Sequence, residues 1–576
     1  MGKRGRRDEG LFGHNSLGDK LRALLFGSKK DSRKDTAKEE AKRPIETVRR
    51  SADQVEPARE RLEQAREARP DSRHPHLKGS SKAEIVLPEI APCHFEMLRE
   101  RPEAPRHTGP RGARKSIRLK YGSGPETDLV IGIDLGTSCT KIVVRDAIRD
   151  EAFGVPIGEL SGFDSAYLCP SRISISQTGT LRLEPAGLSI WDFKTRLVKF
   201  GDTLFRLEER FPEATALEMT TAYLALVLTH TLWWIEQQLG RRLEKTAVTW
   251  HLNVGIPTNQ LHVAHSATPF RIALLAGWIL AEQGPTDITL CEVRTALAEV
   301  DSWLAAEDEQ AWRPRHHISR DFVHAFPEIV AEVSGYARSK IRKAGLHFIM
   351  DVGAGTVDLA TFNLVDRPDG DAYAIFLTKV YSLGTARLLS YRQNALDSIL
   401  GKDSDRDEIV NKALFGGAGM TSSLPDLNTL APSLSAERRP EVDSGFISMV
   451  RSGCAQILLE TKANRIQDAY QWENGLPVFI CGGGSLEPVY LRSLKLVEST
   501  FTPAKQGFRY IDLQMPDQFY ASGLAPAMFH RLAVANGLAY RHFDIGEPIP
   551  PSEIPDLKRR DIPELLGGAF VRKEDV

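Results

Sequence analysis

Cysteine is scarce in this 576-residue chain, and none of the six cysteines forms a CxxC pair. They are scattered from Cys93 to Cys481, a spacing that argues against a structural zinc site or a disulfide framework and fits a reducing compartment. The sequence also lacks an apolar run near the ~20 residues that span a bilayer. No secretory apolar region follows the charged start, and Arg6 stands where a myristoylation signal needs Ser or Thr. We expect a cytoplasmic protein without a transmembrane segment.

Aromatic residues are sparse in the first 120 residues, which are rich in Arg, Lys, Glu, Pro and Ser. This region holds 30 Lys and Arg against 19 Asp and Glu, so the formal net charge of -1 hides a basic N-terminal region and an acidic remainder. Such a composition predicts disorder with short helices, one of which, Ser16–Phe26, carries leucines at helical spacing. We expect residues 1–120 to engage an unknown protein partner, and we expect no sequence-specific nucleic-acid partner. The oligomeric state stays open.

Two segments of the remaining chain repeat one pattern. Residues 129–144 read LVIGIDLGTSCTKIVV, and residues 348–362 read FIMDVGAGTVDLATF. In each, an aliphatic run leads to an aspartate, Asp134 or Asp351, and a glycine-rich turn leads into a second apolar run. The pattern predicts two β-hairpins. Because the two aspartates are 217 residues apart, the repeat indicates two similar halves of the chain.

The glycine-rich turns suit phosphate binding, because a residue without a Cβ lets a phosphate approach the backbone N–H groups. The glycines concerned are Gly136, Gly353 and Gly355, and the hydroxyl donors beside them are Thr137, Ser138 and Thr356. If the two halves face each other, Asp134 and Asp351 meet across a cleft. Carboxylates placed in this way can hold a hydrated Mg2+, and Asp358 adds a third carboxylate nearby.

The two hairpins resemble the phosphate-1 and phosphate-2 motifs of the actin-like ATPase superfamily, which includes actin, the sugar kinases and heat shock protein 70. The second hairpin, Asp351-Val-Gly-Ala-Gly-Thr-Val-Asp358, is closest to the heat shock protein 70 nucleotide-binding domain. The resemblance covers about residues 128–541 and implies an α/β fold with two lobes, each ribonuclease-H-like, around a nucleotide cleft. It implies ATP and Mg2+ as ligands. The chain beyond Tyr540 is too short for the peptide-binding domain of a heat-shock chaperone.

Further segments match the family in the same order along the chain. Lys194 is the nearest match to the lysine that reaches the γ-phosphate, but Thr195 intervenes before the expected Arg-Leu pair, so Lys141 is an alternative. Glu328 follows Pro327 at a predicted helix start, where it would orient water. Residues 382–389 resemble the segment that begins the next helix, and residues 477–485 resemble the adenosine motif. No Glu and Lys pair for the ribose could be placed.

The resemblance therefore implies a complete set of site residues. The catalytic set is Asp134, Lys194, Glu328, Asp351 and Asp358; the nucleotide-binding set is Gly136, Thr137, Ser138, Lys141, Gly353, Gly355, Thr356, Gly384, Gly482, Gly483, Gly484 and Ser485; and Asp134 and Asp351 would hold Mg2+ through water. The expected domains are a basic N-terminal region (1–120), a first lobe (121–346), a second lobe (347–541) and a C-terminal tail (542–576).

The predicted function is an ATP-binding, ATP-hydrolysing switch whose lobe closure controls partner binding. Its reaction would convert ATP and water to ADP and phosphate, and slow hydrolysis remains open. Two other functions stay open. One is a metabolite kinase, because IGIDLGTSCTK also resembles the first motif of sugar kinases. The other is a filament-forming protein of the bacterial actin type, since a fold alone does not choose among these functions.

Overall fold

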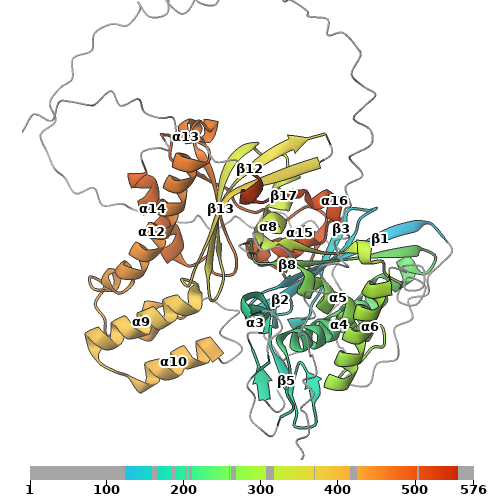
Figure 1. The fold of residues 1–576 in the computed structure, drawn as a ribbon. Coiled ribbons are helices and arrows are strands. Elements are labelled where there is room, and N and C mark those ends of the chain that lie inside the picture. The colour runs from blue at the N-terminus through green and yellow to red at the C-terminus, as the bar shows by residue number, and fades with distance from the viewer. Residues whose placement is uncertain are drawn as a thin grey trace, which may run out of the picture. The chain divides into compact units, whose positions relative to one another are not determined.

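The structure is a computed structural model, and it describes residues 124–158, 165–184, 188–191, 193–200, 204–205, 211–258, 260, 267–306, 317–368, 370–415, 424–501 and 505–554. Within these residues the protein is mixed α/β, as expected, with two large sheets and a small four-stranded one (Figure 1). The helices predicted within residues 1–120 lie outside the described residues.

The first predicted hairpin forms the centre of the first large sheet. Strands β1 and β2 pair antiparallel, β8 adds parallel to β1, and β10 adds parallel to β8. The sheet consists of β10 (Val323–Pro327), β8 (Ala247–Ile256), β1 (Glu126–Leu135), β2 (Cys139–Asp146), β3 (Glu151–Gly154) and β16 (Phe519–Tyr520), with β4 (Cys169–Pro170) beside β2. The aliphatic run of β1 is buried on both faces, which is typical of a central strand covered by helices.

The second large sheet repeats this strand order. Strands β11, β12 and β13 pair antiparallel in succession, and β14 and β15 add parallel on the other side of β11. The sheet consists of β15 (Phe508–Tyr510), β14 (Leu476–Cys481), β11 (Gly345–Val352), β12 (Val357–Arg367), β13 (Gly370–Tyr381) and β17 (Glu547–Ile549). Each strand has a counterpart in the first sheet, so the sequence repeat corresponds to a repeat of topology. Strand β17 belongs to residues 542–576, which the sequence alone assigned to a tail.

The small sheet and the helices flank these two sheets. The small sheet contains β7 (Leu188–Ile190), β5 (Ile173–Ile175), β6 (Thr180–Arg182) and β9 (Ile288–Thr289). The helices are α3 (Phe193–Phe200), α4 (Ala216–Leu243), α5 (Thr268–Ala281), α6 (Leu290–Ala306), α8 (Glu328–Ala337), α9 (Thr385–Leu400), α10 (Ser404–Phe415), α11 (Leu427–Leu430), α12 (Arg439–Asn464), α13 (Tyr470–Asn474), α14 (Pro488–Thr500), α15 (Ala533–Leu538) and α16 (His542–Ile545), and the 3-10 turns include η4 (Pro526–Arg531). In the ranges that the structure describes, no helix is both long and apolar enough to cross a bilayer.

Alternating side chains of β11 supply two separate cores. Phe348 and Met350 pack against α12 and α14 on one face of the second sheet, whereas Ile349 packs against α8 and α15 on the other face. Helix α15 also packs against the first sheet, since Ala535 shares a core with Val143. Helices α8 and α15 therefore lie between the two sheets, and each of them belongs to a segment that passes from one sheet to the other.

Helix boundaries follow the sequence signals, with one correction. Helix α4 begins with a capping box, in which the Thr215 hydroxyl accepts a hydrogen bond from the Glu218 N–H and the Glu218 carboxylate accepts one from the Thr215 N–H. For α5 the Thr268-Pro269 pair in the sequence predicts Thr268 as the N-cap and Pro269 as the first helical residue, and the N-cap prediction is wrong. Ala267 occupies the N-cap without a side-chain hydrogen bond, because Thr268 is already in the first helical turn and is buried.

Candidate functional site

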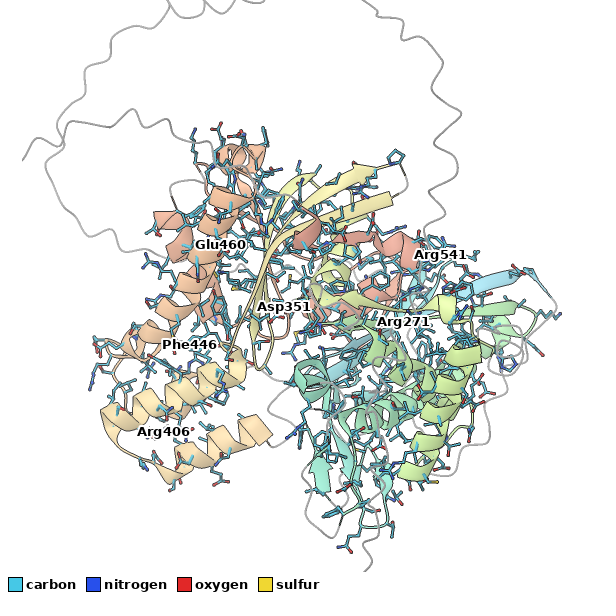
Figure 2. All side chains as sticks on the ribbon, viewed as in Figure 1. Arg271, Asp351, Arg406, Phe446, Glu460 and Arg541 are labelled. Atoms are coloured by element: carbon cyan, nitrogen blue, oxygen red, sulfur yellow. The ribbon has the colours of Figure 1, made fainter. Side chains whose placement is uncertain are left out.

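The ends of the central strands in both large sheets meet at one cavity of about 460 Å3. Its lining includes both glycine hairpins, the glycine turn after β14, the start of α8 and the start of α9. Asp351, at the end of β11, is labelled in Figure 2. The parallel strands of each sheet present their C-terminal ends to this cavity, which is where α/β sheets usually bind ligands.

The first hairpin places an ion pair in the cavity wall. Asp134 and Lys141 are directly opposite each other in the β1–β2 ladder, and the Lys141 ammonium donates a hydrogen bond of 2.9 Å to the Asp134 carboxylate. Asp134 is only 5% exposed. The turn between them is tight, because a Cβ on Gly136 would lie 2.4 Å from the Cys139 carbonyl oxygen. Thr137 and Ser138 line the cavity beside this ion pair.

The second hairpin places two carboxyl groups opposite each other. Asp351 and Asp358 are partners in the β11–β12 ladder. Burial, together with the charges of Asp358 and Glu328, raises the pKa of Asp351 to about 8. Burial likewise raises the pKa of Asp358 to about 6, with a further contribution from Glu328. Two half-buried carboxyl groups this close are unfavourable as a pair of anions, so the arrangement favours a cation between or beside them.

Glu328 and Lys194 connect α8 to α3 at the cavity wall. Glu328 is the first residue of α8, after Pro327 at the N-cap position. The Lys194 ammonium donates a hydrogen bond of 2.5 Å to the Glu328 carboxylate, and both side chains are largely buried. An acidic residue in the first turn also complements the helix dipole. The predicted helix start at Pro327-Glu328 is confirmed, and the two predicted catalytic residues are direct partners.

The glycine turn after β14 approaches the second hairpin closely. Gly482 has a φ of +80°, and a Cβ on it would lie 2.0 Å from a carboxylate oxygen of Asp351. The Gly484 N–H donates a hydrogen bond of 2.9 Å to the Val352 carbonyl oxygen. In contrast, a Cβ on Gly355 or on Gly483 would meet nothing within 4 Å. Both of these glycines line the cavity, so they leave room for a ligand beside the backbone.

Two predicted binding residues do not line the cavity, namely Gly384 and Ser485. Gly384 instead supports the second hairpin from behind. Its Cβ would lie 2.5 Å from the Ala354 carbonyl oxygen, and the backbone of Thr385 donates a hydrogen bond of 3.1 Å to Gly353. All the other predicted site residues do line the cavity. The sequence thus located the residues that converge, although their binding roles stay predictions.

The cavity also contains charged groups that the sequence analysis missed, namely Glu332, Glu487 and Arg531. Glu332 is 2% exposed, and neither carboxyl oxygen has a hydrogen-bond partner among the described residues. Burial raises its pKa well above the ordinary value, and the charges of Asp351 and Asp134 raise it further. Its position four residues after Glu328 on one helix was a signal available in the sequence. Arg531 and Glu487 had no comparable signal.

Glu460 and Lys462, which the sequence could not assign to a ribose, lie away from this cavity on α12. Glu460 is labelled in Figure 2, and its carboxylate accepts a hydrogen bond of 2.6 Å from Lys379 of β13. The ammonium of Lys462 lies 5.1 Å from the ring centre of Trp472. Both side chains therefore attach α12 to its neighbours.

Carboxyl groups outnumber basic side chains in the cavity lining: Asp134, Glu328, Glu332, Asp351, Asp358 and Glu487 face Lys141, Lys194 and Arg531. This excess suits a ligand that brings a hydrated divalent cation, which protein carboxylates usually hold in pairs and through water. Among the described residues, no group of three or more His, Cys, Asp or Glu side chains is arranged to chelate a metal directly. A cation held by two carboxylates through water fits this geometry.

Comparison with protein-family models finds no match for this chain, and comparison with curated proteins finds no similar sequence. What defines the protein is therefore its own structure, which is a mixed α/β fold with two sheets of matching topology and one acidic, glycine-lined cavity between their strand ends.

Proposed function

We propose that the protein binds ATP with Mg2+ in this cavity, hydrolyses it, and has the two-lobed fold of the actin-like ATPases. The observation that carries the proposal is the convergence of Asp134 and Asp351. They occupy equivalent strands of two equivalent sheets, and they line one cavity together with three glycine turns. Under this proposal the first lobe contains the first large sheet, and the second lobe contains the second sheet, including β17 beyond residue 541.

The residues present fit a triphosphate. Gly355 and Gly483 have open space where a Cβ would stand, so phosphate oxygens can approach the backbone N–H groups of both turns. The carboxylates of Asp134 and Asp351 would hold Mg2+ through its water molecules. When bound, Mg2+ would neutralise charge on the phosphates. Leu424 and Leu486 supply apolar surface near Glu487 at another part of the lining, which suits a nucleobase.

The chain's own residues would act mainly by positioning. Glu328, held at 2.5 Å by Lys194, has a fixed orientation in which it can accept a proton or a hydrogen bond from a water molecule. Asp358 lies opposite Asp351 and can orient the same water. Lys141 is held by Asp134 and can contact a phosphate only from that place. Phosphoryl transfer depends largely on such positioning and on charge stabilisation.

The test is calorimetric titration of the full chain with ATP and ADP, with and without Mg2+. Wild type is expected to bind both nucleotides, and Asp351→Asn is expected to lose the Mg2+-dependent part of the affinity. Gly355→Ala should fold like wild type, since its Cβ meets nothing in the protein, yet it should bind nucleotide more weakly because the methyl group occupies phosphate space.

Asp366→Asn is the control, because Asp366 lies at the far end of β12 and is exposed. It should bind like wild type. Release of phosphate from ATP, measured in the same preparations, reports hydrolysis. If wild type shows no affinity for ATP in the presence of Mg2+, the proposed function is wrong.

A further inference from the structure

The three basic side chains of the cavity differ in their partners. Lys141 forms an ion pair with Asp134 at 2.9 Å, and Lys194 forms one with Glu328 at 2.5 Å. Arg531 forms no ion pair with any carboxylate among the described residues, and its Nε atom is buried without a hydrogen-bond partner. Its Nη2 atom lies 3.5 Å from the Gly483 carbonyl oxygen, which is at the limit of a hydrogen bond.

The position of Arg531 relates it to the first hairpin and to the glycine turn after β14. It ends the 3-10 turn η4, two residues before α15, and its charge acts on Cys139 in the first hairpin. Its contact with Gly483 places it beside the glycine turn of the second sheet as well. The neighbouring His530 also lines the cavity, but burial lowers its pKa, so Arg531 carries the positive charge at this point at neutral pH.

A half-buried guanidinium without a carboxylate partner costs solvation energy that an anionic ligand can recover. Because the cavity otherwise has an excess of carboxyl groups, an unpaired arginine there would be unexpected if it had only a structural role. The guanidinium can donate two parallel hydrogen bonds to a phosphate, whereas an ammonium group offers a single point charge.

We propose, on the basis of the ATP-binding function proposed above, that Arg531 binds the terminal phosphate of the nucleoside triphosphate and thereby lets α15 respond to its presence. ADP lacks this phosphate, so the contact distinguishes the two nucleotides. The residue is a phosphate-binding group supplied by the same chain, and it stands on the segment that connects the two sheets.

The segment that follows Arg531 is packed so closely that a shift of Arg531 would displace the neighbouring elements. A Cβ on Gly537 would lie 1.7 Å from the Ala331 carbonyl oxygen of α8, and a Cβ on Gly132 would lie 2.3 Å from the Ala535 carbonyl oxygen. Helix α15 is therefore in backbone contact with both α8 and β1. A displacement at its first residue must move one of these neighbours, because close-packed backbones leave no free space.

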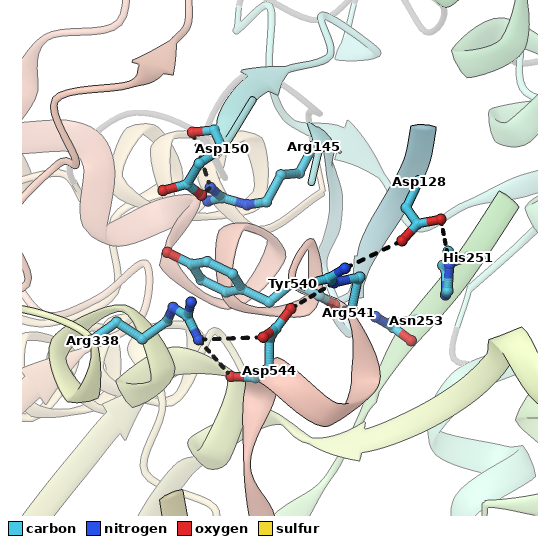
Figure 3. Close-up of polar contacts among 9 residues, drawn as sticks. All are labelled: Asp128, Arg145, Asp150, His251, Asn253, Arg338, Tyr540, Arg541 and Asp544. Carbon is cyan, nitrogen blue, oxygen red and sulfur yellow. Dashed lines mark hydrogen bonds and ion pairs between the residues drawn. The ribbon is translucent and has the colours of Figure 1, made fainter. Parts of the chain in front are cut away.

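The end of this segment is attached on both sides. Figure 3 shows Tyr540 between Arg145 of β2 and Arg338, which follows α8, with guanidinium carbons 4.0 and 4.8 Å from the ring centre. The next residue, Arg541, donates hydrogen bonds to Asp128 of β1 and to Asp544 of α16. From there the chain enters β17 of the second sheet. The segment between Arg531 and β17 thus contacts both sheets.

The test compares ATP and ADP affinities of Arg531→Ala, Arg531→Lys and wild type. Arg531→Ala is expected to weaken ATP binding by about 10- to 100-fold, the range of a charge-assisted hydrogen bond, while ADP binding changes less than about twofold. Arg531→Lys should restore part of the ATP affinity, because it keeps the charge. A purely structural role would weaken both nucleotides alike.

Arg172→Ala is the matched control. Arg172 also has a buried, unpartnered Nε atom, but it stacks on Trp191 and does not line the cavity. It should leave the ratio of ATP to ADP affinity unchanged. If wild type binds both nucleotides and Arg531→Ala keeps the wild-type ratio of ATP to ADP affinity, the role proposed for Arg531 is wrong, while the proposed function stands. If wild type binds neither nucleotide, the proposed function itself fails.

Discussion

Ionisable residues that are buried without a charged partner should make the stability of this protein depend on pH. His347 is the clearest example. Its ring lies between Phe362 and Phe479, with ring centres 5.1 and 5.9 Å away. Its Nδ1 atom donates a hydrogen bond of 2.7 Å to the Gly345 carbonyl oxygen, and its Nε2 atom accepts one of 3.3 Å from the Tyr336 hydroxyl. Burial lowers the pKa of His347 to about 4.

This lowered pKa predicts acid sensitivity. In the unfolded chain the histidine binds a proton as the pH falls below ~6.5, whereas in the folded protein it stays neutral until about pH 4. The contribution of His347 to the free energy of unfolding should therefore be fully present above pH 6.5 and should fall between pH 6.5 and 4, by at most about 3.4 kcal/mol. The raised pKa values of Asp351 and Asp358 act in the opposite direction over the same range, so the contribution of His347 is read from the difference between wild type and a His347 variant. Urea unfolding at several pH values checks this.

The comparison for His347 is the variant His347→Gln, which cannot titrate in this range but can still donate to Gly345. It should be less stable at pH 7, because the ring contacts are lost, yet its stability should fall less steeply between pH 6.5 and 4. An unchanged slope would contradict the role of His347. His324 has a similarly lowered pKa and should leave part of the slope in both proteins.

Residue roles were only partly accessible from the sequence. Asp134, Asp351 and the glycines of the two hairpins could be selected because the repeat itself marks them. The pairing of side chains could not be predicted, because the hydrogen bond between Lys194 and Glu328 joins residues that are 134 positions apart. Gly384 and Ser485 do not line the cavity, and Gly384 packs against the second hairpin; the binding roles of both residues stay predictions.

At the scale of elements, the crossing of α8 and α15 depends on a missing side chain. Gly537 faces the Ala331 carbonyl oxygen so closely that a Cβ would stand 1.7 Å from it. A Cβ on Gly335, in the other helix of the same crossing, would lie 3.7 Å from the Asn536 side-chain amide, which is an ordinary van der Waals distance. The two glycines therefore offer an experiment in which the same change meets two different environments.

Gly537→Ala should destabilise the protein by about 2–3 kcal/mol or more, because the two helices must move apart. Gly335→Ala should be neutral or stabilise it by about 0.5–1 kcal/mol, since alanine loses less backbone entropy in a helix. Thermal and chemical unfolding of both variants provides the measurement. Equal changes in stability would show that the crossing is not limited by backbone contact.

Elements with a strong local pattern were predictable, and those held by distant partners were not. The hairpin strands β1 and β11 and the helix α8 appeared in the sequence as aliphatic runs and a proline-marked start. Strand β17 could not be recognised in the sequence, because its three residues, Glu547–Ile549, form a strand only through pairing with β13. Helix α6 is likewise held by a distant partner, since Arg294 donates a hydrogen bond of 2.6 Å to Glu218 of α4.

At the scale of the whole molecule, the repeat of topology is the feature on which the proposed switch depends. Two sheets of matching strand order share one cavity and are joined through α8 and the α15–β17 segment. The matching order could be expected from the repeated hairpins, but the convergence of their strand ends required the structure. If ATP contacts both sheets, its binding should favour conformations in which they lie closer together.

A distance measurement between labels on opposite sides of the cavity tests this closure. Cys291 of α6 is exposed, while the other cysteines among the described residues are buried, and Met449 of α12 is 43% exposed. Spin labels at Cys291 and at Met449→Cys, with Cys93 replaced by Ser, should show a shorter distance with ATP and Mg2+ than without nucleotide. Pulsed electron paramagnetic resonance provides the distance distribution.

A second pair of labels separates closure from local change. Gln237 lies on the exposed side of α4, and α4 contacts α6 on the same side of the first sheet, so the distance from Cys291 to Gln237→Cys should stay constant. In the background of Asp351→Asn the first pair should lose its response, because the cation proposed to join the two halves would no longer be held. An identical distribution for Cys291 and Met449→Cys with and without ATP, in a protein shown to bind ATP, would mean that the nucleotide occupies the cavity without moving the sheets and that the protein is not a closure switch.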